Sequence, residues 1–148
     1  MREIELNHIN INGTEYPLHC DFNVLEIIQD KFTSVNQFER DLLGLTPLRD
    51  ENGDLQRDES GSILNSQGEP KIKAIVYGLY LMIREGQRID ARQTGKEWEE
   101  LPLDVIREEC TVPFTDIADI LHETFKRCFN VKKKVAKKTT RRRKNTTS

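Results

Sequence analysis

The chain has 148 residues and a formal net charge of −2; hydrophobic residues make up 36% of it and charged residues 32%. This composition is too apolar for a wholly disordered chain and too polar for a membrane protein. No segment approaches the roughly 18 apolar residues that a bilayer-spanning helix needs. We therefore expect a soluble, cytoplasmic protein with one compact core and no membrane partner.

The small net charge conceals an acidic body and a basic tail. Nine of the 23 basic residues lie in residues 132–148, and the 14 others face all 25 acidic residues, which leaves residues 1–131 at about −11. Large hydrophobic residues also end near Val131, so the tail cannot offset its ordering entropy by burial. We predict a helical domain over residues 1–131 and a disordered basic tail over residues 132–148. The tail cations are Lys132, Lys133, Lys134, Lys137, Lys138, Arg141, Arg142, Arg143 and Lys144.

The first 44 residues predict a β-hairpin followed by two short helices. Apolar residues alternate from Ile4 to Cys20, and Asn12-Gly13 suits a two-residue turn because both residues tolerate positive φ. Asp21 can cap the first helix, and Ser34, followed three residues later by Gln37, is typical of a capping box. Gly44 is placed as the stop of the second helix. The first helix is expected to bury Phe22, Leu25, Ile28 and Phe32.

Residues 45–69 are rich in turn-forming residues and poor in large hydrophobic residues. The segment is predicted to be a projecting hairpin or a loop inserted in the helical domain. We expect no internal repeat in the chain.

The second half of the body predicts three more helices. Pro70 suits a first helical position, and a central, buried helix follows from Ile72 and ends before Gly86. Pro102 opens a short helix. The last helix has apolar residues in steps of three and four, namely Phe114, Ile117, Ala118, Leu121, Phe125 and Cys128. The expected fold is mainly α with a small N-terminal β-hairpin: a compact helical domain plus the basic tail.

The sequence offers little catalytic chemistry. His19 and Cys20 are adjacent, but neighbouring side chains of a strand point to opposite faces, so we expect a packed cysteine and an exposed histidine rather than a catalytic pair. Three widely spaced cysteines fit neither a disulfide framework nor a zinc site, and we expect reduced thiols. We predict no enzyme, no metal site and no cofactor.

A calcium-loop pattern begins at Asp50 but fails at its two decisive positions. The sixth residue is Leu55 where glycine is needed, and the twelfth is Gly61 where a bidentate glutamate is needed. The acidic residues here are predicted to form a solvated turn.

The nine tail cations are candidates for binding a polyanion. They can neutralise phosphates and release counterions, which gives salt-sensitive attachment to nucleic acid. The tail has no aromatic residue on which bases could stack. An acidic protein partner, including another copy of the chain, and a purely solubilising role remain alternatives.

Several segments together resemble the tail assembly chaperones of long, non-contractile-tailed (siphovirus-type) phages and prophages. The likeness is one of order and local pattern over most of residues 9–129. It is carried by residues 12–18 (NGTEYPL), 21–25 (DFNVL), 34–43, 73–86 (KAIVYGLYLMIREG) and an amphipathic helix that ends near Phe129.

The resemblance implies a non-enzymatic helical protein that binds the tape-measure protein, keeps it soluble and gives way to tail-tube subunits. It implies self-association, action in the cytoplasm of the bacterial host and absence from the mature virion. It also implies a translational frameshift near the end of the reading frame, with which the lysine runs of the tail are compatible. Phe125 and Phe129 of the last helix are our candidate partner-binding residues. A small nucleic-acid-binding protein that attaches through its tail is the alternative function.

Overall fold

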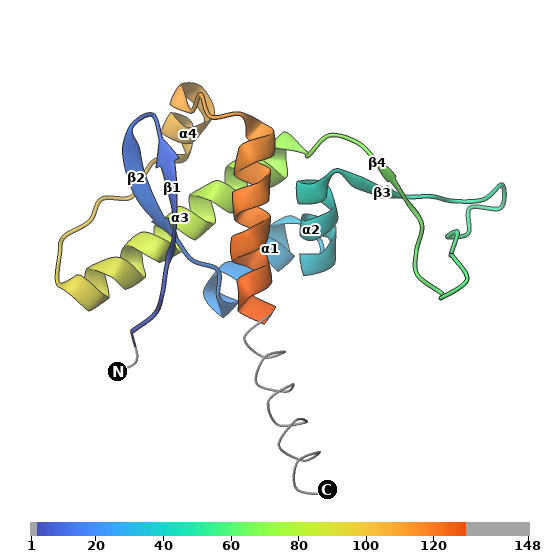
Figure 1. Cartoon of the computed structure of the whole chain (residues 1–148), viewed down its shortest axis with the longest axis horizontal. Coiled ribbons are helices and arrows are strands. Elements are labelled where there is room, and N and C mark those ends of the chain that lie inside the picture. Colours follow the sequence, from blue (N-terminus) through green and yellow to red (C-terminus); the bar gives the residue numbers. More distant parts are fainter. Residues whose placement is uncertain (1–2, 130–148) are drawn as a thin grey trace, which may run out of the picture.

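A computed structural model describes residues 3–129 of the chain (Figure 1). In this range five helices and two small antiparallel sheets form, which confirms the predicted class, mainly α with an N-terminal β-hairpin. The predicted domain end at residue 131 and the predicted tail lie outside the described range. The elements are β1 (Asn7–Ile11), β2 (Thr14–Leu18), α1 (Phe22–Lys31), α2 (Val35–Leu43), β3 (Leu45–Pro47), β4 (Asn65–Gln67), α3 (Ile72–Thr94), α4 (Leu103–Glu109) and a last helix at 114–129.

The N-terminal hairpin turns at Asn12-Gly13, as predicted. Both residues have positive φ, 52° and 90°, and Ile11 pairs with Thr14 across the two-residue turn. Ile9 and Ile11 face the core, since alternate residues of a strand share one face. The predicted strand is too long at its start, because residues 3–6 precede β1 as a lead without strand pairing.

The predicted caps of α1 and α2 are present. The Asp21 carboxylate accepts a hydrogen bond from Val24 N at 3.2 Å, and Ser34 Oγ accepts one from Gln37 N at 2.9 Å. Gly44 ends α2 in the left-handed region, at φ 73°. The expected burial of Phe22 is wrong: this side chain is 68% exposed, because it opens α1 at the edge of the core.

The long helix α3 is the centre of the core, with buried residues on most sides (Figure 1). The prediction that it ends before Gly86 is wrong, since α3 continues to Thr94 and stops at Gly95. Gly86 allows the backbone of β2 to lie close to α3, because a Cβ at this position would be 2.4 Å from the carbonyl oxygen of Pro17 in β2. His19 N then donates a hydrogen bond to the Met82 carbonyl at 3.0 Å. The N-cap of α3 is Lys71, so Pro70 lies just outside the helix.

The helix at 114–129 packs on α2 and α3. An aromatic cluster joins it to the two short helices, with ring centroids 5.1 Å apart for Phe32 and Phe38 and 5.8 Å apart for Phe38 and Phe125. Gly78 of α3 leaves room for the Phe38 ring, which would lie 3.0 Å from a Cβ at that position. The helices therefore form one core around α3.

Residues 48–64 form a lobe that projects from the helical body beyond β3 and β4 (Figure 1). The segment predicted as a hairpin or loop is thus a hairpin with an elaborated tip, and none of its residues belongs to the buried core. Three backbone hydrogen bonds of 2.9 Å close the lobe as a ring, from Leu48 N to Leu64 O, from Gln56 N to Leu48 O and from Leu64 N to Gln56 O.

The prediction of no internal repeat is wrong, because the lobe repeats an eight-residue unit. Residues 49–55 (RDENGDL) recur as residues 57–63 (RDESGSI). In each unit the aspartate side chain, Asp50 or Asp58, accepts two backbone N–H groups at 2.9 and 3.0 Å. The arginine of each unit donates to the carbonyl of its glycine, at 2.8 and 2.9 Å. Two matching turns thus stabilise the lobe without a core.

Candidate functional site

A cavity of about 630 Å³ opens where the lead to β1, the connector from β2 to α1 and the end of the helix at 114–129 meet. It is lined by Ile4, Glu5, Asn7, residues 18–23, Thr124, Arg127 and Cys128, and we call it the connector cavity. Its volume lies within the roughly 300–1,000 Å³ typical of ligand sites. It is the strongest candidate for a binding site in the described part of the chain.

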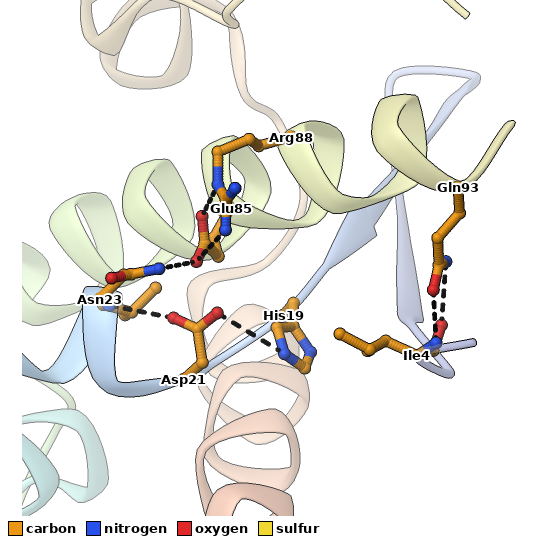
Figure 2. Close-up of polar contacts among 8 residues, drawn as sticks. Ile4, His19, Asp21, Asn23, Glu85, Arg88 and Gln93 are labelled. Atoms are coloured by element: carbon orange, nitrogen blue, oxygen red, sulfur yellow. Dashed lines mark hydrogen bonds and ion pairs between the residues drawn. The ribbon is translucent and has the colours of Figure 1, made fainter. Parts of the chain in front are cut away.

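Side chains from distant parts of the sequence hold the cavity wall. Gln93 Nε2 donates to the Ile4 carbonyl at 3.2 Å, and Ile4 N donates to Gln93 Oε1, which ties the lead to the end of α3 (Figure 2). Asn7 Nδ2 donates to Thr124 Oγ1 at 2.9 Å, and Arg127 donates to the Asn7 side-chain oxygen. The lead is therefore held to α3, and the first residue of β1 is held to the last helix.

A polar cluster joins the cavity wall to α3 (Figure 2). Glu85 of α3 is only 6% exposed and accepts hydrogen bonds from Arg88 Nε at 2.6 Å and from Asn23 Nδ2 at 2.8 Å. Asp21 lines the cavity and keeps 25% of its side-chain surface exposed, and one carboxylate oxygen lies 3.7 Å from His19 Nε2. Buried carboxylates are expected to have such partners.

The two carboxyl groups differ in their affinity for protons. Burial, followed by the hydrogen bond shared with Glu85, raises the pKa of Asp21 to about 6. Burial alone would raise the pKa of Glu85 as well, but hydrogen bonds from Arg88, Asp21 and Asn23 outweigh it and lower that pKa to about 2. Burial lowers the pKa of His19, so its imidazole is neutral at pH 7. The Asp21 carboxyl group thus titrates near pH 6, well above its ordinary range.

The expected packed cysteine is confirmed, since Cys20 is buried, whereas His19 is half-buried rather than exposed. β2 ends at Leu18, so both residues lie in the connector, and both line the connector cavity. The hydrogen bond to Cys128, followed by burial, raises the pKa of Cys20, so the sulfur stays a protonated thiol. A protonated thiol is a poor nucleophile. The three cysteines are reduced thiols, as expected, and two of them, Cys20 and Cys128, are hydrogen-bonded to each other.

The predicted partner-binding residues fall in different environments. Phe125 is 3% exposed and belongs to the aromatic core, so it cannot present its ring to a partner in this conformation. Phe129 is 38% exposed and stacks edge-on against Phe125 at 5.3 Å. The nine tail cations lie outside residues 3–129. Only Phe129 of these residues is therefore placed at a described surface.

Other kinds of site find no support in residues 3–129. No group of three or more His, Cys, Asp or Glu side chains in this range is placed to hold a metal ion. No helix of the described range is long and apolar enough to cross a membrane.

Sequence reasoning missed most of the cavity. Asp21 was recognised only as a helix cap, although its neighbours His19 and Asn23 share the same short connector. A signal existed in α3, where Glu85 and Arg88 stand three residues apart within an otherwise buried helix. Arg127 gave no such signal, because the outer face of an amphipathic helix ordinarily carries charge.

Comparisons of the chain with protein families, with curated proteins and with solved structures found no match. The function is therefore argued from the sequence pattern and from the geometry of the connector cavity.

Proposed function

We propose that this protein is a phage or prophage tail assembly chaperone that binds the tape-measure protein and keeps it soluble during tail-tube assembly. The proposal takes its partner from the order of segments over residues 9–129. Its place of action would be the host cytoplasm, before the tail-tube protein displaces it from the tape measure. It needs no catalytic group, metal or cofactor.

The observation that carries the proposal is the connector cavity, which has an exposed aromatic residue in its lining. Phe22, at 68% exposure, and the half-buried Ile4 and Cys128 contribute its accessible apolar wall. Phe129 follows Cys128 in the last turn of the helix at 114–129. A long tape-measure helix presents apolar stripes, and an open apolar-walled cavity can receive side chains from such a stripe. Covering these side chains would keep the partner from aggregating.

The test is co-expression with the tape-measure protein of the same genome. We expect the two proteins to co-purify, and the tape measure to become insoluble without this chain. Failure to co-purify, together with no gain in tape-measure solubility, would overturn the proposal.

The helix at 114–129 offers a matched pair of variants for the same experiment. Phe114 and Phe129 begin and end this helix at nearly equal exposure, 37% and 38%. Phe129→Ser removes an aromatic ring from the end of the helix that borders the cavity, whereas Phe114→Ser removes one from the other end. We expect only Phe129→Ser to reduce co-purification, by about tenfold if the ring supplies about 1.4 kcal/mol of binding. Equal losses for both variants would argue against the cavity end as the binding surface.

The nine tail cations favour a second candidate function, which is nucleic-acid binding through residues 132–148. The acidic body would repel phosphates, so this binding would depend on the tail alone. This function predicts an affinity for DNA or RNA that falls steeply between 50 and 200 mM salt, as it does for proteins with about six to ten phosphate contacts. The affinity should disappear on truncation after Val131. No binding at low salt would remove this candidate.

A further inference from the structure

The charged groups around the connector cavity pair off, except for one. Glu85 pairs with Arg88 at 2.6 Å, and Glu5 pairs with Arg127 at 3.7 Å. Among residues 3–129, Asp21 has no ion pair with a lysine or arginine. It lies 3.7 Å from the neutral imidazole of His19 and shares a hydrogen bond with the Glu85 carboxyl group, and neither of these supplies a positive charge. Three carboxylates thus face two guanidinium groups, and the unbalanced negative charge belongs to Asp21.

We propose that the connector cavity recognises a partner segment in which one lysine or arginine lies among apolar side chains. The Asp21 carboxylate receives the cation, and the apolar wall at Ile4, Phe22 and Cys128 receives the neighbouring side chains. The inference rests on the proposed function for the identity of the partner, but not for the chemistry of the site.

The position of Asp21 explains why a cation is preferred. A carboxylate that is half withdrawn from water has lost part of its hydration, and a charge-assisted hydrogen bond replaces what was lost. Lysine and arginine carry their charge on long apolar stems, so the stem can lie along the wall while the head reaches the carboxylate. A neutral apolar segment would cover the wall and leave Asp21 without a cationic partner. An acidic segment would add repulsion.

The other cations of the site do not cancel this preference. Arg88 is held behind Glu85 by two hydrogen bonds, of 2.6 and 3.1 Å. Arg127 faces the cavity, but Glu5 lies 3.7 Å from it and opposes its charge. The field at Asp21 therefore stays negative at neutral pH.

Three synthetic peptides test the inference directly. Each has the same 18-residue amphipathic helical sequence of Leu, Ala and Gln with a fluorescein label, and one central position of the leucine stripe is Lys, Met or Glu. Binding to the full chain is followed by fluorescence anisotropy at pH 7.5. We expect the Lys peptide to bind about tenfold more tightly than the Met peptide, since a hydrogen bond to a charged group contributes about 1.5 kcal/mol or more and tenfold corresponds to about 1.4 kcal/mol. The Glu peptide should bind most weakly.

Asp21→Asn identifies the carboxylate as the cause of this preference. Asparagine caps a helix about as well as aspartate, so α1 should be retained, which far-UV circular dichroism can verify. The variant should bind the Lys and Met peptides equally, with the Met peptide within about twofold of its affinity for the natural chain. Asp119→Asn, on the exposed face of the helix at 114–129, makes the same change in net charge and should keep the preference.

The preference for the Lys peptide should also decrease as the pH is lowered. As the pH falls from 7.5 to 5, Asp21 takes up a proton near pH 6 and the advantage of the Lys peptide should fade. The charged and titratable groups facing Asp21 are His19, Cys20, Glu85 and Arg88. The His19 imidazole lies at salt-bridge distance from Asp21, so His19→Gln tests whether it contributes, and this variant should retain the pH effect.

Two results would overturn the inference: equal affinity of the natural chain for the Lys and Met peptides, or a Lys preference that survives Asp21→Asn. The proposed function fails separately. If the tape-measure protein does not co-purify while the Lys preference and its loss in Asp21→Asn are observed, the cavity recognises a basic and apolar segment of another protein.

Discussion

The crossing of β2 over α3 makes Gly86→Ala a sharp test of the fold. A methyl group at this position would lie 2.4 Å from Pro17 O and 2.8 Å from Leu18 N, both of which are backbone atoms of β2 or its end. Such atoms cannot rotate away as the tip of a side chain does, so the hairpin would have to lift from α3. The hydrogen bond from His19 N to the Met82 carbonyl lies beside this contact and would lengthen.

Two opposing terms set the magnitude. Alanine is favoured over glycine inside a helix by about 1 kcal/mol, and overpacking a tight contact costs about 3 kcal/mol when the neighbours are rigid. We expect Gly86→Ala to lower the free energy of unfolding by about 2 kcal/mol. This corresponds to a decrease in Tm of about 6–10 °C for a domain of this size. Urea denaturation followed by far-UV circular dichroism measures the change, with thermal melting as the second assay.

Gly78→Ala in the same helix is the matched control. Its Cβ would meet the Phe38 ring at 3.0 Å and a Leu121 methyl at 3.2 Å, and side-chain atoms can give by a few tenths of an ångström. The gain in helix propensity then offsets most of the cost, and the free energy of unfolding should change by less than about 1 kcal/mol. A Gly86→Ala protein as stable as the natural chain, or more stable, would refute the close crossing of β2 over α3.

Three further predictions concern the site, the core and the lobe. The pKa of Asp21 is raised from an ordinary value near 4 to about 6, so the folded state binds the proton more tightly than the unfolded state, and this group stabilises the protein as the pH falls from about 7 to 4. Asp21→Asn should remove this pH-dependent stabilisation, as measured by urea denaturation at several pH values, and an unchanged pH profile would contradict the prediction. Phe38→Ala should lower the free energy of unfolding by about 3–5 kcal/mol because the ring is fully buried, whereas Phe129→Ala should lower it by less than about 1 kcal/mol. Similar losses for both variants in chemical denaturation would show that Phe38 is not a core residue. Replacing residues 48–64 by Asn-Gly should join Pro47 and Asn65 by a two-residue hairpin turn and keep the Tm within a few degrees of the natural chain, since these residues add nothing to the core. A protein that no longer melts cooperatively would show that the helical body needs the lobe to fold.

Local chemistry explains which elements could be predicted from the sequence. The turn at Asn12-Gly13, the caps at Asp21 and Ser34, and the stop at Gly44 each depend on hydrogen bonds or dihedral angles within a few residues. The apolar spacing of the last helix likewise specifies its buried face. The repeat in residues 49–63 was also present in the sequence, but a polar pattern of period eight matches neither a helix nor a strand and was not recognised.

The connector cavity shows what a sequence cannot provide. Glu5, Asp21 and Arg127 come from three separate elements, and they meet only because the lead, the connector and the end of the last helix converge. The pKa of Asp21 depends on burial and on Glu85 of α3, neither of which follows from its role as a helix cap. Which of these charges is left without a counterion is therefore a property of the packed molecule.

Gly86 shows the same division within a single residue. By itself the sequence determined the types and order of the helices, because propensity, capping and apolar periodicity act over a few residues. It could not show whether this glycine ends α3 or allows a strand to cross it. Only the tertiary structure decided that, because the contact between Gly86 and Pro17 joins residues far apart in the chain and depends on how the hairpin and α3 cross.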